Sequence, residues 1–389
     1  MTKEIRKNLS QAKKLYQSEK FKEALDIYEE CYLENPEVFT RWNKIFYSWS
    51  LYRIYIKDPE DEDKLFESAK VVTELVKQED LNKNDTCPYT FSVFKVLDYL
   101  YSDGDYSNLI YWLDKINPEL LDENQFKSND RVYRSRKEKY YDYSSKAYFE
   151  CEEYEKCISI SKEALNTLTV FTNSGDVWHR WRIAKSLKEL LENRKALTYL
   201  EEVVKVKKDW FVQKEIAENY YILDEDEKAL DYICEAVLSN DPINIKVNLY
   251  YLAYKILKEN NPDLALKHAE LFLAIKLDNE SQIPDDIEEL LIDEDNLDKK
   301  ELESEIRQYW LEYKFKDQQL QYGTITKIFE HGKSGFITSD DSTSYYFNVS
   351  DFKGDNLDVG QYVSFFTEKS FDKSKNKESL RAVNIKNEF

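Results

Sequence analysis

Apolar and small residues recur along the first three quarters of the chain with the period of roughly 3.6 residues that is typical of amphipathic helices. In the first segment with this pattern, Ala12 and Ala24 are small residues at positions where two helices must approach closely. Pro36 follows the second stretch, as expected after the end of a helix. The pattern predicts two packed helices, whose remaining core positions are Leu15, Phe21, Tyr28 and Cys31.

The same frame of positions returns further along the chain. Strong copies span 216–236 and 252–272, and weaker copies span 148–164 and 184–203. The key small residue of each copy falls at 157, 196, 229 and 265, in steps of 39, 33 and 36 residues. These steps lie around the period of about 34 residues of tetratricopeptide repeats, and the segments resemble that family. Residues 42–120 fit less well and predict degenerate helix pairs.

This resemblance covers residues 5–277 and implies an α-solenoid of about seven helix pairs that serves as a protein-interaction scaffold. In such repeats the first helix of each pair lines a concave groove. Leu9 stands where a carboxylate clamp would need lysine, so we do not expect binding of chaperone tails. The repeat frame places a basic and aromatic cluster in the groove: Lys139, Lys146, Trp178, Trp181, Arg182, Lys185 and Lys188.

This groove cluster has two interpretations. It could bind an acidic peptide, a carboxylate or a phosphate backbone, and nearby Arg131, Arg134, Arg136 and Lys137 add charge of the same sign. The alternative is a set of solvated charges with structural tryptophans, since helix surfaces normally carry Lys and Arg. The sequence leaves both open.

The last part of the chain changes character. Five of the seven glycines lie after residue 322, among segments that alternate apolar and polar residues with period two. The pattern predicts a small five-stranded antiparallel β-barrel with one solvated face, its strands at 323–329, 334–338, 345–352, 360–365 and 381–385. Over residues 322–386 these segments resemble the cold-shock domain, an oligonucleotide-binding barrel.

The resemblance implies a face on which aromatic side chains stack the bases of single-stranded nucleic acid. Phe336 and Tyr346 retain two aromatics of the family motifs, whereas Ser334 replaces a third. Phe329 follows Lys327 by two residues on the same strand face and could supply a replacement ring. The candidate nucleic-acid-binding residues are Lys327, Phe329, Lys333, Phe336, Tyr346 and Asn348, with Lys369, Lys373, Lys375 and Lys377 as further phosphate contacts.

An acidic segment separates the two patterns. Residues 285–317 carry 13 acidic and 5 basic residues, with an apolar stripe that predicts a capping helix: Leu302, Ile306, Trp310 and Phe315. We therefore expect a helical repeat domain at 1–280, an acidic capping helix and linker at 281–318, and the barrel at 319–389.

Composition excludes several classes of function. A net charge of −20 rules out nucleic-acid binding through a basic surface over the whole length, so such a contact must be local. With five cysteines, three histidines and no Cys-x-x-Cys pair, we expect no disulfide frame, metal or cofactor.

No phosphate-binding glycine loop or nucleophile elbow occurs, so we expect no enzyme and no catalytic residues. A charged start and the lack of a long apolar run predict a cytoplasmic protein without a membrane partner.

Two hypotheses follow. In the first, the chain is an adaptor that binds a protein in the solenoid groove and single-stranded nucleic acid, RNA in preference to DNA, on the barrel. In the second, it is a pure protein scaffold whose barrel has lost its ligand. Ser334 and Asn348, which stand where the family usually has an aromatic residue and a histidine, favour the second, and Phe336 and Tyr346 favour the first. The sequence leaves the partner's identity and the oligomeric state open.

Overall fold

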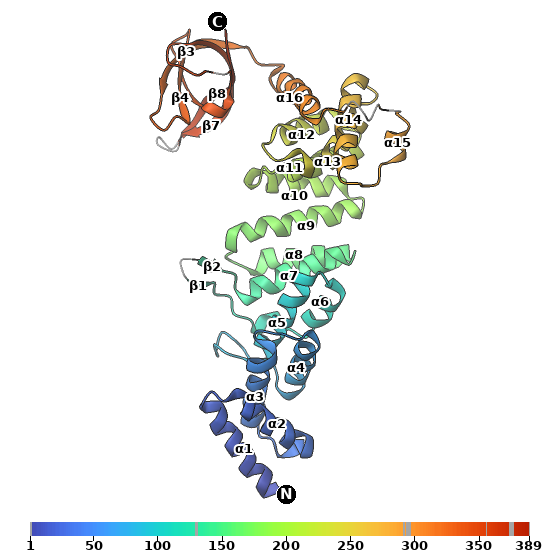
Figure 1. The fold of residues 1–389 in the computed structure, drawn as a ribbon, viewed down its shortest axis with the longest axis vertical. Coiled ribbons are helices and arrows are strands. Elements are labelled where there is room, and N and C mark those ends of the chain that lie inside the picture. The colour runs from blue at the N-terminus through green and yellow to red at the C-terminus, as the bar shows by residue number, and fades with distance from the viewer. Residues whose placement is uncertain are drawn as a thin grey trace. The chain divides into compact units, whose positions relative to one another are not determined.

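A computed structural model describes residues 2–128, 131–290, 292, 297–354, 356–372 and 377–388. The chain divides into two compact units, Met1–Lys208 and Asp209–Phe389. The first unit is built mainly from helices, and the second adds a β-barrel to its helices (Figure 1).

The first unit contains five consecutive helix pairs, and the two helices of each pair pack against one another. Small residues allow this approach: Ala12 and Ala24, the pair that the sequence pattern picks out, are fully buried. The helices are α1 (Thr2–Gln17), α2 (Phe21–Glu34), α3 (Arg41–Leu51), α4 (Glu62–Leu75), α5 (Pro88–Asp103), α6 (Tyr106–Leu113), α7 (Arg136–Glu150), α8 (Tyr154–Thr167), α9 (Gly175–Glu189) and α10 (Asn193–Val206).

The turn within several of these pairs uses a residue in the left-handed region. Glu19, Glu152 and Leu191 have φ of 61°, 60° and 61°, at equivalent places in their pairs. These side chains carry a steric cost of about 1 kcal/mol or more in this conformation, which glycine would avoid. The turns of these three pairs therefore carry backbone strain that glycine would relieve.

A short hairpin, β1 (Phe126–Ser128) and β2 (Arg131–Tyr133), precedes α7. No sequence pattern predicts a strand in these segments. Phe126 and Tyr133 pair across the two strands with ring centroids 5.9 Å apart, and both side chains are exposed. An exposed two-stranded ribbon has no buried face, so it lacks the alternation that identifies strands in a sequence.

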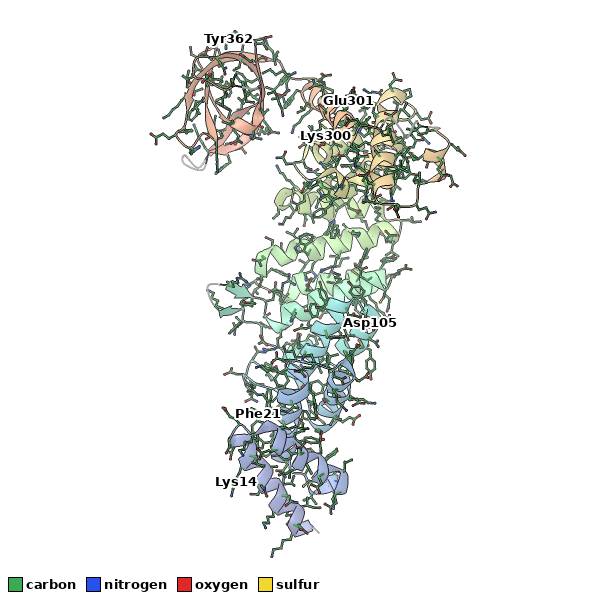
Figure 2. The ribbon with its side chains drawn as sticks, in the orientation of Figure 1. Lys14, Phe21, Asp105, Lys300, Glu301 and Tyr362 are labelled. Atoms are coloured by element: carbon green, nitrogen blue, oxygen red, sulfur yellow. The ribbon has the colours of Figure 1, made fainter. Side chains whose placement is uncertain are left out.

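The second unit begins with two further helix pairs, followed by α15 and α16. The predicted apolar stripe of the acidic segment is buried, and α16 packs against α12 and α14. Asp298 begins α16 by accepting hydrogen bonds from the N–H groups of Lys300 and Glu301, both labelled in Figure 2. The helices are α11 (Trp210–Ile222), α12 (Asp226–Leu238), α13 (Val247–Leu257), α14 (Pro262–Asp278), α15 (Asp285–Glu288) and α16 (Lys299–Phe315).

The barrel follows in the same unit. Neighbouring strands pair in the order β5-β4-β3-β7-β8, and a β5–β8 pairing closes the sheet. This closing pair is parallel, so the barrel is mixed, whereas an antiparallel barrel was expected. The strands are β3 (Gln321–Ile328), β4 (Ser334–Ser339), β5 (Ser344–Asn348), β6 (Phe352–Lys353), β7 (Tyr362–Asp372) and β8 (Lys377–Asn387).

The barrel interior explains one glycine. A Cβ at Gly335 would lie 2.2 Å from the carbonyl oxygen of Lys327 and 2.7 Å from the ring of Phe347. Only glycine lets strand β3 and this ring approach β4 so closely. The core residues, all fully buried, are Ile325, Ile337, Phe347, Val363, Phe365, Ala382 and Ile385.

These observations confirm the predicted fold class of a mainly helical, tetratricopeptide-like solenoid followed by a small five-stranded barrel. Seven helix pairs, α1 to α14, occur among the described residues. The helical part ends with α16 at Phe315, and the first barrel strand begins at Gln321.

Candidate functional site

Three aromatic side chains form a row across neighbouring barrel strands. Phe336 on β4 stands opposite Tyr346 on β5 in register, and their ring centroids are 5.9 Å apart. The ring of Phe329, directly after β3, lies 5.7 Å from Phe336. Ile337 and Phe347, the next residues along β4 and β5, point into the core. Because successive side chains of a strand alternate between its two faces, the row lies on the outer face of the barrel. The structure thus brings together the three aromatics that the sequence predicts on one face of the barrel.

The polar candidates surround this row. The ammonium group of Lys327 lies 5.0 Å from the centroid of the Phe329 ring, which supports the shared strand face. Asn348 accepts a hydrogen bond from the hydroxyl of Tyr346 at 3.1 Å and so orients that ring. Lys333 is exposed in the turn before β4. Of the loop lysines, Lys369 lies on β7 and Lys377 on β8, while Lys373 and Lys375 fall outside the described residues.

Arg381, which no sequence motif indicates as a site residue, stands opposite Tyr346 where β5 and β8 close the barrel. Its guanidinium donates to Asp351 at 3.1 Å and to Glu368 at 2.8 Å. Glu368 also pairs with Lys314 of α16 at 2.8 Å. Burial would raise the pKa of Glu368, but Lys314 and Arg381 outweigh burial and lower it. The charge of Arg381 therefore lies beside the aromatic row, but the carboxylates of Asp351 and Glu368 already pair with it.

The groove candidates of the solenoid lie on two helices, Lys139 and Lys146 on α7 and the other five on α9. Lys139 pairs with Asp98. The ammonium group of Lys146 lies 4.8 Å from the ring centroid of Tyr101. The two tryptophans, Trp178 and Trp181, meet edge to face, with ring centroids 5.8 Å apart.

Lys185 and Lys188 follow along α9. The ammonium group of Lys185 lies 4.9 Å from the Trp181 ring centroid and 4.7 Å from that of Phe149. Lys188 is half-buried in the last turn of α9. Lysines that lie against aromatic rings have fixed stems and still present their charge to a ligand.

Arg182 differs from the other groove residues. Its side chain is 14% exposed, and it pairs with the buried carboxylate of Asp142 at 2.8 Å. Arg134 pairs with the same carboxylate. Burial would raise the pKa of Asp142, but the two arginines outweigh burial and lower it, and burial beside Arg182 lowers the pKa of His179 to about 4. The charge of Arg182 thus stabilises the interior of the helix pairs.

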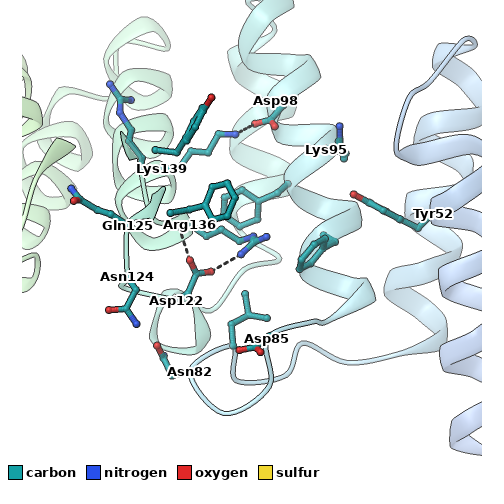
Figure 3. A pocket seen from close by; sticks show the side chains of 16 residues that line it. Tyr52, Asn82, Asp85, Lys95, Asp98, Asp122, Asn124, Gln125, Arg136 and Lys139 are labelled. Atoms are coloured by element: carbon teal, nitrogen blue, oxygen red, sulfur yellow. Dashed lines mark hydrogen bonds and ion pairs between the residues drawn. The ribbon is translucent and has the colours of Figure 1, made fainter. Parts of the chain in front are cut away.

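Two clefts flank the β1–β2 hairpin. One, of about 720 Å³, mixes charges: Figure 3 shows Arg136 facing Asp122 and Lys139 facing Asp98. The other, of about 700 Å³, has three basic residues, and its described lining includes no carboxylate. The described residues that line this basic cleft are Arg131, Val132, Tyr133, Arg134, Lys139, Tyr143, Thr172 and Asn173.

Among solved structures, the chain is similar to the apo form of RapI, with 14% identity and a TM-score of 0.43 over 79% of this chain and 86% of that one. A tetratricopeptide repeat protein from Parabacteroides merdae is 13% identical, with a TM-score of 0.34 over 79% and 98% of the two chains. A thermophilic tetratricopeptide protein of Thermus thermophilus is 12% identical, with a TM-score of 0.27 over 64% and 98%. At these values the likeness carries no functional conclusion. No family model and no curated protein matches the chain.

Within the described residues, no group of three or more His, Cys, Asp or Glu side chains has the arrangement of a metal site. No described helix is both long and apolar enough to cross a membrane.

Proposed function

We propose that the chain is a non-enzymatic adaptor, whose barrel binds single-stranded nucleic acid and whose solenoid binds a protein. The observation that carries the nucleic-acid part is the aromatic row of Phe329, Phe336 and Tyr346 on the outer face of the barrel. Such rings stack bases without regard to sequence, at about 1–3 kcal/mol per base. We favour RNA over DNA and expect the protein to act in the cytoplasm.

Exposed lysines beside the row support this proposal. Lys327 and Lys333 are exposed beside the rings, and we expect them to contact phosphate groups. Because these lysines are few, we expect weak binding with a modest dependence on salt.

The protein part of the proposal assigns an acidic segment of a partner to the groove. The described lining of the basic cleft carries Arg131, Arg134 and Lys139, in a chain whose net charge is −20. Arg134 and Lys139 also pair with Asp142 and Asp98, which lie outside that lining. Lys146 and Lys185 add charges that are held against aromatic rings. A local excess of positive charge attracts an acidic ligand and sets its orientation. Linking both sites in one chain raises the effective concentration of each ligand near the other.

The test measures, by fluorescence anisotropy at low salt, how tightly labelled single-stranded RNA and DNA bind to the full-length protein. Replacing Phe336 and Tyr346 together by Ala should reduce affinity by about tenfold or more, because two stacking surfaces are lost. Tyr322→Ala is the matched control, since Tyr322 is 40% exposed and Tyr346 is 38% exposed on the same barrel.

The outcome also distinguishes the scaffold hypothesis. If the wild-type protein binds neither RNA nor DNA at low salt, the barrel has no nucleic-acid function. The chain would then be assigned as a protein scaffold. Equal losses in the Tyr322→Ala control and the double variant would also contradict the assigned face.

A further inference from the structure

The turn between β3 and β4 brings a histidine onto the end of the aromatic row. The N–H of Gly332 donates to the carbonyl oxygen of Phe329 at 2.8 Å and closes a tight turn. Gly332 has φ of +67°, a conformation that other residues rarely adopt. The turn folds His331 back against Phe329, and their rings stack with centroids 5.6 Å apart and planes 29° apart.

The hydrogen bonding of His331 defines which edge faces outward. The backbone N–H of Lys333 donates to Nδ1 of His331 at 3.1 Å. Because Nδ1 accepts, a neutral imidazole ring carries its proton on Nε2. The His331 side chain is exposed, and Nε2 has no hydrogen-bond partner among the described residues. The ring therefore offers both a flat aromatic surface and a donor to a ligand.

We propose that His331 is a further nucleic-acid-binding residue of the barrel, on which one more base stacks while Nε2–H donates to a base or phosphate oxygen. This inference rests on the proposed function of the barrel. His331, Phe329, Phe336 and Tyr346 then form a continuous series, with successive centroids 5.6, 5.7 and 5.9 Å apart. Histidine is among the side chains on which unstacked RNA bases stack.

Ser334 explains why the added ring matters. Its side chain is buried and small at the first position of β4, so this strand presents only one ring, that of Phe336, to the outer face. The backbone N–H of Phe329 donates to the carbonyl oxygen of Ser334 at 3.0 Å, which joins the turn to β4. The turn that carries Phe329 and His331 thus places two rings beside Ser334, where β4 lacks an aromatic side chain.

The experiment measures the affinity of the full-length protein for uridine oligonucleotides that lengthen one residue at a time. For the wild type, affinity should rise until each of the four rings holds a base. His331→Ala should weaken binding of the longest oligonucleotide by about fivefold or more and remove the gain from the last added nucleotide. His331→Phe should retain most of that gain, because it keeps the ring.

Three results would overturn the inference. The first is unchanged affinity in His331→Ala while Phe336→Ala weakens binding, which would leave the proposed function standing without His331. The second is an equal loss in His331→Ala and His331→Phe, which would exclude stacking. The third is no binding by the wild type, in which case the proposed function fails as well. Circular dichroism of each variant separates loss of contact from loss of fold.

Discussion

A buried histidine fixes α16 to α14, and its protonation provides a sharp test of the structure. His268 is fully buried between the carbonyl oxygen of Leu264, 2.8 Å from Nδ1, and the indole nitrogen of Trp310, 3.0 Å from Nε2. The indole N–H can only donate, so Nε2 must accept and Nδ1 must carry the proton. A second proton on the ring would point at the indole N–H.

The magnitude follows from the shift in pKa. Burial lowers the pKa of His268 from 6.5 to about 4. The folded state therefore binds fewer protons than the unfolded state, and stability rises with pH across this window. The contribution is fully present above pH 6.5 and is lost as the pH falls towards 4. Between pH 7 and pH 5 this group should cost the protein about 2 kcal/mol.

The assay is urea unfolding followed by circular dichroism at pH 7 and pH 5, for the wild type and for His268→Leu. The wild type should lose about 2 kcal/mol more than the variant over this interval. His179, whose pKa is also lowered to about 4, is present in both proteins and cancels from the comparison.

A double-mutant cycle with Trp310→Phe adds a second readout. Each single change leaves one buried polar group without its partner, at about 1–3 kcal/mol, so the double variant should lose less than the sum of the two. Equal pH dependence in the wild type and His268→Leu, together with additive losses, would refute the assigned hydrogen bond.

Further predictions concern the first unit. Leu191→Gly should stabilise the protein by up to about 1 kcal/mol, because it relieves left-handed strain, whereas Leu33→Gly should destabilise it. Both leucines are exposed, at 82% and 87%, so thermal melts that shift in the same direction would contradict this reasoning. Replacing Lys146 and Lys185 together by Glu should weaken binding of a labelled oligo-glutamate peptide and lower the melting temperature only modestly, since each half-buried lysine loses contacts with aromatic rings that contribute about 0.5–2 kcal/mol. Arg182→Met should instead destabilise folding by about 3 kcal/mol or more in urea unfolding, because it leaves a buried carboxylate short of a partner. An unchanged midpoint of urea unfolding would show that Arg182 contributes no more to folding than a solvent-exposed charge does.

The sequence by itself determined the type and order of the helix pairs and of the main barrel strands, but not the β1–β2 hairpin. Small residues at Ala12 and Ala24 and the period-two runs around Ile337 and Phe347 report burial on one face, and that burial is a local property of a helix or strand. The same periodicity predicted the buried stripe of α16. It also placed Phe336 and Tyr346 on one face of the barrel, because alternation along a strand fixes which side chains point outward.

Only the tertiary structure decided the pairings between distant residues. The periodicity of α9 indicates a surface position for Arg182, but its partner Asp142 comes from α7, and no spacing rule connects them. The parallel closure of β5 with β8 likewise depends on the path of the chain between them. His331 reaches the aromatic row through the conformation of Gly332, which hydrophobic patterning does not record. Sequence patterns report burial along one element, whereas ion pairs, strand closure and ring contacts depend on which elements meet in space.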